Sequence, residues 1–144
     1  MFYHFKIHKE TKGYWAECIE LDGCYTQAQN IKDLRIKMKE ALDLFLSEPE
    51  KSNHLFAMPL KKAPKYKGRS VEKVHVDPSV AFSMLIRQTR IKKSLTLREM
   101  ASILNYKNIN TYVKLEKAKT CNPQLRTLAN IKQQFSNFPM ALIF

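Results

Sequence analysis

Residues 96–118 read TLREMASILNYKNINTYVKLEKA and carry the clearest structural signals in the chain. Thr96 is followed three residues later by Glu99, a capping box that marks the first turn of a helix. The turn at 105–107 ends that helix, and Asn108 has a side chain suited to capping another one. Two short helices joined by a tight turn are therefore predicted, over 97–104 and 109–117.

Helical patterns continue on both sides of this segment. Asp77-Pro78 predicts the start of a helix, because proline is tolerated at a first helical position. Apolar residues then recur at 81, 82, 85 and 86, within a helix expected over 80–91. Residues 123–135 predict a fourth helix, whose inward residues are Leu125, Leu128, Ile131 and Phe135. Residues 78–144 are therefore expected to form an all-α domain.

The order of residues in this half resembles the Xre or phage-repressor class of helix-turn-helix domains. The resemblance implies that the helix over 109–117 enters the major groove of DNA. Leu97 stands where glutamine is usual in that class, and Ala118 stands where glycine is usual. The resemblance rests on Leu85-Ile86-Arg87-x-x-Arg90, the capping box, Tyr112-x-x-Leu115-Glu116 and Pro123-x-Leu125.

A helix in the major groove contacts base edges through its N-terminal side chains. Asparagine pairs with adenine through two hydrogen bonds, and threonine contacts several bases or the thymine methyl group. Nearby basic and hydroxyl side chains contact phosphates and set the register. The candidate base-contacting residues are Asn108, Asn110, Thr111 and Lys114, and the candidate phosphate-contacting residues are Thr96, Arg98 and Lys107.

The positive charge is concentrated in the same half of the chain. Of a net charge of +12 over 144 residues, residues 78–144 carry +9 and residues 1–77 carry +3. Residues 1–50 are net acidic, at −2. Contact of the C-terminal half alone with nucleic-acid phosphates fits this distribution. A basic helical face that is merely solvated is the alternative.

The N-terminal half has the pattern of an antiparallel sheet. Tyr3, Phe5 and Ile7 alternate with polar residues, a period of two that places the apolar set on one face. A hairpin turn is expected at 11–13 and another turn at Asp22-Gly23, because glycine adopts a positive φ readily. A three-stranded antiparallel meander is therefore predicted, with its second strand over 14–21 and a short third strand over 24–27.

A helix capped by Asn30 is expected to cover this sheet, with Asp33 favoured near its positive end. Pro49 predicts the end of the helix. Residues 47–70 are a predicted connector that contains an apolar island at 55–60, and 71–76 predicts one more strand. The island is expected to pack on its own domain, with docking on a partner as the alternative. The inward helical residues are expected to be Ile31, Leu34, Met38, Ala41, Leu42 and Phe45.

Residues 13–27 read GYWAECIELDGCYTQ, followed by the amphipathic helix. This segment resembles the HicB family of antitoxins, whose pattern is Gly-Tyr, a strand, and then Leu-x-Gly-Cys-x-Thr-Gln. The resemblance covers nearly the whole chain, although Ala28 stands where a glycine often follows the Thr-Gln pair. It implies an α+β fold, with a partial ribonuclease-H-like sheet and covering helix over 1–77 and a helix-turn-helix domain over 78–144.

The same resemblance implies two binding functions. HicB-type N-terminal domains block a small HicA ribonuclease toxin, and the C-terminal domain represses the operon that encodes both proteins. A toxin that grips RNA is expected to be basic, so acidic residues are the candidate toxin contacts. The candidates are Glu17, Glu20 and Asp22, with simple solvation of these carboxylates as the alternative. Family members are typically dimers or higher homo-oligomers.

Two other functions remain open. One is a stand-alone transcription regulator whose N-terminal half senses a ligand or oligomerises. The other is a nucleic-acid-processing enzyme, which requires clustered carboxylates to hold metal ions. The three acidic candidates form no recognisable set of that kind, and the four histidines lack a partnered nucleophile. We therefore expect no catalysis, no metal and no cofactor.

The remaining features concern location and assembly. Cys18, Cys24 and Cys121 lack a short C-x-x-C pair, which argues against a disulfide framework or zinc site and favours a reducing compartment. No signal-peptide layout and no membrane-spanning apolar stretch is evident, so a cytoplasmic location is expected. The apolar residues 138–144 are expected to pack on the fourth helix or to pair with another subunit, and we favour a role in dimerisation.

Overall fold

The computed structural model describes residues 1–47 and 53–144, which divide into two compact units. Among these residues, the first unit comprises 1–47 and 56–76, and the second comprises 53–55 and 77–144. The main boundary falls just before Asp77, because that residue belongs to the second unit as the N-cap of its first helix. The helix end predicted at Pro49 lies outside the described residues.

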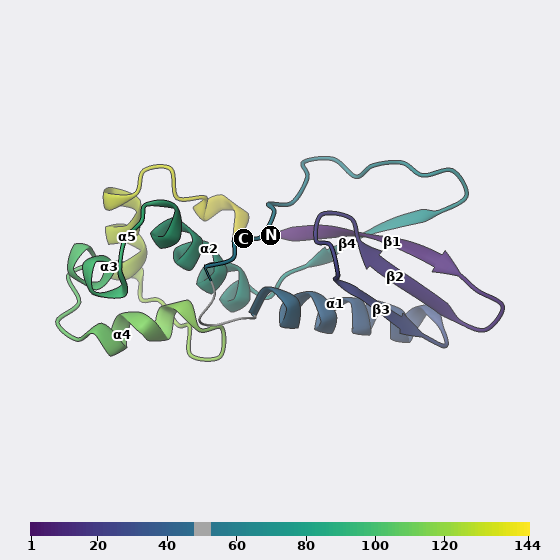
Figure 1. The fold of residues 1–144 in the computed structure, drawn as a ribbon, viewed down its shortest axis with the longest axis horizontal. Coiled ribbons are helices and arrows are strands. Elements are labelled where there is room, and N and C mark those ends of the chain that lie inside the picture. Colours follow the sequence, from purple (N-terminus) through teal and green to yellow (C-terminus); the bar gives the residue numbers. More distant parts are fainter. Residues whose placement is uncertain (48–52) are drawn as a thin grey trace. The chain divides into compact units, whose positions relative to one another are not determined.

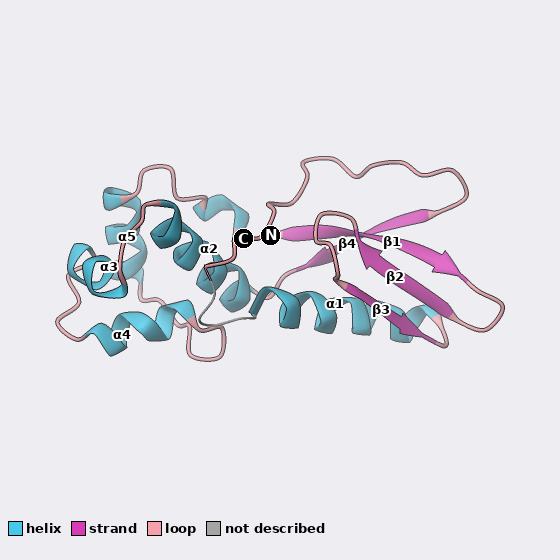
Figure 2. Ribbon diagram, viewed as in Figure 1, coloured by secondary structure: helices cyan, strands magenta, loops and turns pink. Residues whose placement is uncertain are grey.

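The fold is mixed α+β, with a four-stranded antiparallel sheet in the first unit (Figures 1 and 2). The three N-terminal strands form the predicted meander, and the last strand pairs with the first, which gives the order β3-β2-β1-β4. The alternating residues Tyr3, Phe5 and Ile7 are buried, as predicted. The strands are β1 (Phe2–Lys9), β2 (Tyr14–Cys18), β3 (Tyr25–Ala28) and β4 (Ser70–His75).

The turn between β1 and β2 depends on Gly13. Its φ is +89°, a conformation that residues with a Cβ atom rarely adopt. A Cβ atom at this position would lie 2.6 Å from the carbonyl oxygen of Ala28, which is the last residue of β3. The backbone of the turn therefore passes directly against the end of the third strand.

Helix α1 (Ile31–Ser47) packs along the sheet, as predicted (Figure 2). Asn30 caps it, since its side-chain oxygen accepts a hydrogen bond of 2.9 Å from the Asp33 amide. The prediction of its inward residues was partly wrong, because Ile31, Ala41 and Phe45 are only half-buried. The buried residues of α1 are Leu34, Met38, Leu42 and Leu46.

Strand β2 ends at Cys18, three residues earlier than predicted. The chain bends after Cys18, and the side chains of Glu20 and Leu21 are buried in the interior of the unit. The Glu20 side chain is only 2% exposed, and one of its oxygens lies 2.6 Å from Nδ1 of the fully buried His4. The Glu20 carboxylate also accepts backbone hydrogen bonds from His4 at 3.0 Å and from Leu60 at 3.1 Å. One carboxylate therefore ties the first strand to the connector that precedes β4.

Part of the apolar island folds onto its own unit, as expected. Phe56 is buried with its ring centroid 5.7 Å from that of Phe45, and the Tyr3 hydroxyl donates a hydrogen bond of 2.8 Å to the Ala57 carbonyl. Leu55 and Leu60 remain exposed. Phe56 and Ala57, within the connector, are thus held to the first unit by ring packing and by a side-chain hydrogen bond to a backbone carbonyl.

The second unit is helical, and α2 (Pro78–Lys92) is its centre. Asp77 caps α2 by accepting a hydrogen bond of 2.8 Å from the Ser79 amide, and every residue from 80 to 88 is buried. A helix buried all round in this way is enclosed by its neighbours. The elements that follow α2 are α3 (Leu97–Ile103), α4 (Ile109–Val113), the 3-10 turn η1 (Lys114–Glu116), α5 (Leu125–Gln134) and the 3-10 turn η2 (Met140–Leu142).

The last predicted helix begins later than expected, at Leu125 rather than residue 123. The prediction that Leu125 points inward was wrong, because its side chain is 85% exposed and Leu128 is half-buried. Thr127 is buried instead, and its hydroxyl lies 2.9 Å from the Tyr106 hydroxyl. The first turn of α5 therefore buries a hydrogen-bonded threonine in place of the predicted Leu125.

The apolar C-terminal residues pack on their own unit. Phe138 is buried with its ring centroid 5.9 Å from that of Phe82 in α2, and Ile143 is buried as well. Phe144 is exposed. The role of this segment in dimerisation stays a prediction. In the described part of the chain, none of the helices has the length and apolar character needed to cross a bilayer.

We predict that Glu20→Ala lowers the free energy of unfolding of the first unit by about 3 kcal/mol, because it leaves a buried imidazole and two backbone amides without their acceptor. Trp15 is the only tryptophan and lies in this unit, so urea unfolding followed by its fluorescence measures the effect. Glu17→Ala, at a carboxylate that is 42% exposed, is the control, with an expected loss below about 1 kcal/mol. Equal losses for the two variants would contradict this assignment.

Candidate nucleic-acid interface

Helix α3 begins with the predicted capping box. The Thr96 hydroxyl accepts a hydrogen bond of 3.1 Å from the Glu99 amide, and the Thr96 amide donates one of 2.7 Å to the Glu99 carboxylate. The hydrogen bond that the Thr96 amide donates to the Glu99 carboxylate is the main reason that the pKa of this exposed carboxyl lies below its usual value. The start of α3 is therefore fixed by reciprocal hydrogen bonds, and the Thr96 side chain is already engaged before any partner binds.

The turn between α3 and α4 is tight and internally bonded. Asn105 has a φ of +61°, which asparagine tolerates better than most residues, and the Tyr106 amide donates a hydrogen bond of 2.8 Å to the Ala101 carbonyl. Ala101 is buried, so a small side chain lies where the two helices approach. Met100, Leu104 and Leu115 are buried as well and form the apolar side of this segment.

Helix α4 is capped as predicted and then changes geometry. The Asn108 side chain accepts a hydrogen bond of 2.8 Å from the Asn110 amide. The prediction of a helix as far as residue 117 was wrong, because α4 ends at Val113 and the chain continues as the 3-10 turn η1. The tighter turn directs Leu115 and Glu116 toward the interior.

The inner side of this segment is anchored by a buried ion pair. Arg90 of α2 donates to both oxygens of Glu116, at 2.6 Å and 3.0 Å, and also to the Leu95 carbonyl at 3.2 Å. The fully buried Tyr112 donates its hydroxyl hydrogen to the same carboxylate. The hydrogen bond to Glu116 raises the pKa of Arg90, and burial raises the pKa of Tyr112, so the guanidinium stays charged and the phenol stays protonated.

The outer side carries the predicted contact residues. All seven candidates are exposed, and three of them, Arg98, Lys107 and Asn108, line one shallow depression between α3 and the start of α4. Ser102 and Tyr106 line it too, although the sequence patterns gave no reason to select them. The structure does not place Thr96, Asn110, Thr111 and Lys114 in that depression; they lie on the exposed surface of α3, α4 and η1.

The acidic candidates of the first unit are not gathered into one site. Asp22 is exposed in the turn before β3, and Glu17 lies on β2 with an oxygen 3.1 Å from Nε2 of His8. Glu20 does not fit the expected role, because its buried carboxylate is already satisfied by His4 and by backbone amides. The sequence alone gave no signal of this burial, since its partners lie 16 and 40 positions away.

The sequence patterns also gave no signal of a cluster formed by His8, Trp15 and Arg69. The rings of His8 and Trp15 stack with their centroids 3.9 Å apart, and Arg69 donates a hydrogen bond of 3.1 Å to Nδ1 of the same histidine. Across residues 1–47 and 53–144, no three histidine, cysteine or acidic side chains gather as ligands for a metal ion.

No protein-family model matches this chain, and a search of curated proteins found no match.

We predict that Glu116→Leu destabilises the second unit by about 3 kcal/mol, because it leaves a largely buried guanidinium without its counter-ion. The double variant Arg90→Leu with Glu116→Leu should recover part of that loss, since both charges are then removed. Urea unfolding followed by far-ultraviolet circular dichroism measures both variants. A double variant less stable than Glu116→Leu alone would show that the pair is not the anchor described above.

Proposed function

We propose that this chain is a HicB-type antitoxin that also represses its own operon. In this proposal the second unit is an Xre-like helix-turn-helix domain that binds DNA. The first unit is a partial ribonuclease-H-like domain that binds and neutralises a small HicA-type ribonuclease toxin. The observation that carries the proposal is the exposed polar face of α4, which follows a capped α3 across a tight turn and is anchored from behind by Arg90 and Glu116.

The chemistry of that face suits DNA. Asn110 and Thr111 are side chains that read base edges, and Lys107 and Arg98 beside them are suited to phosphates. Glu116, one of only two acids over residues 78–144, is neutralised by its buried ion pair. The exposed surface near α4 therefore attracts a polyanion with little opposing negative charge.

The chemistry of the first unit suits a basic protein partner. Residues 1–50 are net acidic in a strongly basic chain. Glu17 and Asp22 are the exposed carboxylates proposed to meet the toxin, and Glu20 is withdrawn from that role because its side chain is buried. Complementary charge of this kind speeds encounter and selects the partner more than it sets affinity.

The alternative is a stand-alone regulator whose first unit binds a ligand or oligomerises. A groove lined by Trp15, Tyr25 and Leu44 is the observation that favours it, because ligand sites combine apolar walls with a few polar groups. Both hypotheses assign a binding role without catalysis or a cofactor, and both imply a cytoplasmic protein that reaches DNA. They differ in whether a toxin exists.

We predict that Asn110→Ala combined with Lys114→Ala abolishes specific binding to the DNA upstream of the gene, at a cost of about 1–3 kcal/mol for the asparagine–base contact alone. Fluorescence anisotropy with that DNA and with a scrambled duplex measures the loss of specificity. The control pair Lys132→Ala with Gln133→Ala changes similar exposed side chains on α5 and should leave binding intact. Equal weakening by both pairs would refute base reading by α4.

The salt dependence of the DNA affinity tests the contribution of Lys107 to DNA binding. A phosphate contact adds about one unit to the slope of log affinity against log salt concentration, so Lys107→Ala should lower that slope by about one. Its effect should be the same on specific and scrambled DNA, because a phosphate contact carries no sequence information. An affinity of the unmodified chain that does not change with salt would refute DNA binding by this unit.

The toxin hypothesis is tested by co-expression with the small gene next to this one, followed by pull-down. We predict that Glu17→Lys with Asp22→Lys weakens capture, whereas the DNA-binding pair at Asn110 and Lys114 leaves it unchanged. Asp33→Lys, which reverses an exposed acid in the first turn of α1, is the control for a change of charge outside the proposed contact. Failure to capture the neighbouring protein would favour the stand-alone regulator.

A further inference from the structure

The connector that leads into β4 is the most basic segment of the first unit. Residues 53–76 contain six lysine or arginine residues and a single acid, Glu72, whereas residues 1–50 are net acidic. All six basic residues are exposed, and Arg35 of α1 pairs with Glu72 through two hydrogen bonds, of 2.8 Å and 3.0 Å. Neither the proposed DNA contact nor the proposed toxin contact uses this positive charge.

The end of the connector is a tight turn that carries an aromatic ring between cations. Residues 65–69 read KYKGR. The Arg69 amide donates a hydrogen bond of 3.3 Å to the Tyr66 carbonyl, and Gly68 has a φ of +70°, which glycine adopts readily. Tyr66 is 37% exposed, so the turn presents one aromatic and three cationic side chains to solvent.

This turn is attached to the sheet by contacts between cations and rings. The Lys6 ammonium lies 4.1 Å from the centroid of the Tyr66 ring, and Arg69 donates a hydrogen bond of 3.1 Å to Nδ1 of His8. Lys6 and His8 flank the buried Ile7 in β1, so they project from the opposite face of the sheet. The turn therefore adds its cations to that face.

The same face continues from β1 onto β4. Lys73 is opposite His4 in the register of the two strands, and its ammonium lies 4.6 Å from the centroid of the Phe2 ring. The ring of the exposed His75 approaches Phe2 edge-on, with the centroids 5.8 Å apart. Rings and cations are thus interleaved on what we call the cationic face, which consists of Phe2, Lys6, Lys73, His75 and the turn 65–69.

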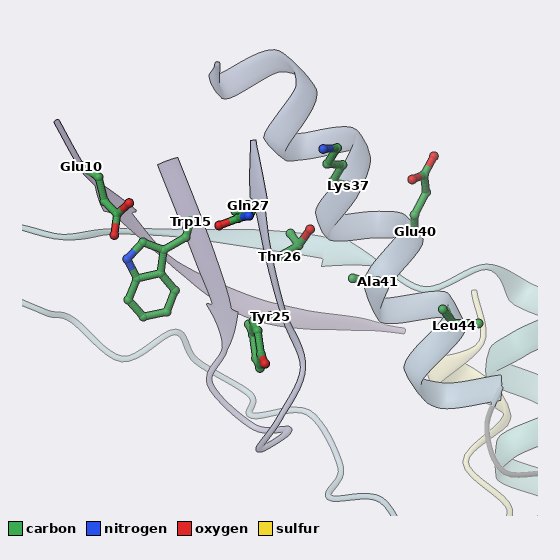
Figure 3. Close-up of a pocket in the computed structure, with 9 residues that line it drawn as sticks. All are labelled: Glu10, Trp15, Tyr25, Thr26, Gln27, Lys37, Glu40, Ala41 and Leu44. Atoms are coloured by element: carbon green, nitrogen blue, oxygen red, sulfur yellow. The ribbon is translucent and has the colours of Figure 1, made fainter. Parts of the chain in front are cut away.

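The other edge of the sheet has the opposite charge. Glu10 and Glu40 line the groove at the β3 edge, with Lys37 as the one cation among its lining residues (Figure 3). Glu17, the acid on β2, has one carboxylate oxygen 3.1 Å from Nε2 of His8. An anion therefore meets a positive surface beside β4 and a net acidic groove beside β3.

We propose that the cationic face binds single-stranded RNA. Surfaces that bind single strands combine aromatic side chains, on which bases stack, with cations that follow the phosphates. Stacking requires the flat face of an unpaired base, which RNA exposes in its loops and ends and a duplex covers. An acidic protein would satisfy the cations but would leave the rings without flat partners.

Tyr66 is the residue proposed to stack on a base. Lys6 lies over one face of its ring, while more than a third of the residue stays exposed. Lys65 and Lys67, the exposed lysines on either side of it, are the proposed phosphate contacts. The proposal concerns the first unit alone, so it does not depend on the proposed DNA or toxin binding, and its test can fail independently of theirs.

Variants of Tyr66 in the full chain test stacking by fluorescence anisotropy. The probe is a labelled oligouridine of about twelve nucleotides, a length within the range that single-strand binding folds cover. Tyr66→Leu should raise the dissociation constant at least about fivefold, because leucine has no flat ring. Tyr66→Phe, which keeps the ring, should bind as the unmodified chain does. Neither variant should change the affinity for the duplex DNA upstream of the gene.

The double variant Lys65→Ala with Lys67→Ala tests the phosphate contacts. Each contact with a single strand adds about 0.7 to the slope of log affinity against log salt concentration, so this pair should lower the slope by about 1.4. Lys32→Ala with Lys37→Ala is the matched control. It removes the same charge at two exposed lysines of α1 and should leave the slope unchanged.

A chain that does not bind the oligouridine would overturn the proposal. So would a Tyr66→Leu variant that binds it as tightly as the unmodified chain, or a loss at Lys65 and Lys67 no larger than that of the α1 control. Equal losses of affinity for oligouridine and for duplex DNA in Tyr66→Leu would also overturn it, because the cationic face would then attract anions without recognising unpaired bases.

Discussion

The buried ion pair between Arg90 and Glu116 is the interaction on which the candidate interface depends. Helix α4 has only five residues, and an isolated helix of that length is unstable in water. Its geometry must therefore be imposed by contacts on its inner side. Glu116 supplies them by accepting two hydrogen bonds from α2 and one from Tyr112, so the opposite side of the segment is left facing solvent.

The first unit also depends on a buried carboxylate that accepts several hydrogen bonds. Glu20 lies in a turn, yet its carboxylate organises the backbone of β1, the ring of His4 and the amide of Leu60. In both units one buried carboxylate joins segments that are distant in sequence, and a charged group with several donors holds its position more firmly than apolar packing alone. Each unit thus has a polar centre that its apolar residues surround.

Local patterns in the sequence were sufficient to predict most elements and their caps. Alternation marked β1, and short-range hydrogen bonds at Asn30, Thr96 and Asn108 marked helix starts, because those interactions span only a few residues. Predictions failed where a distant partner decided the outcome. Strand β2 ended early and Glu20 became buried through His4, and α4 was shortened where Glu116 turns toward Arg90.

In the candidate interface too, local patterns predicted some features, and contacts between distant residues decided the others. Exposure of polar residues on α4 was predictable, because a capped amphipathic helix hides its apolar side. The depression lined by Arg98, Lys107 and Asn108 was not, since it depends on how closely α3 and α4 approach across the turn. Tertiary approach distances are not encoded in any local pattern, and Ser102 and Tyr106 enter the site only through them.

The contact between Gly13 and the end of β3 restricts how this protein can vary. Any residue with a Cβ atom at position 13 would collide with the carbonyl group of Ala28, at the end of the outermost strand. The loop joining the first two strands and the rim of the sheet must consequently change together during evolution. A substitution at position 13 would therefore disturb the outer edge of the sheet at Ala28, although the two positions belong to different turns of the chain.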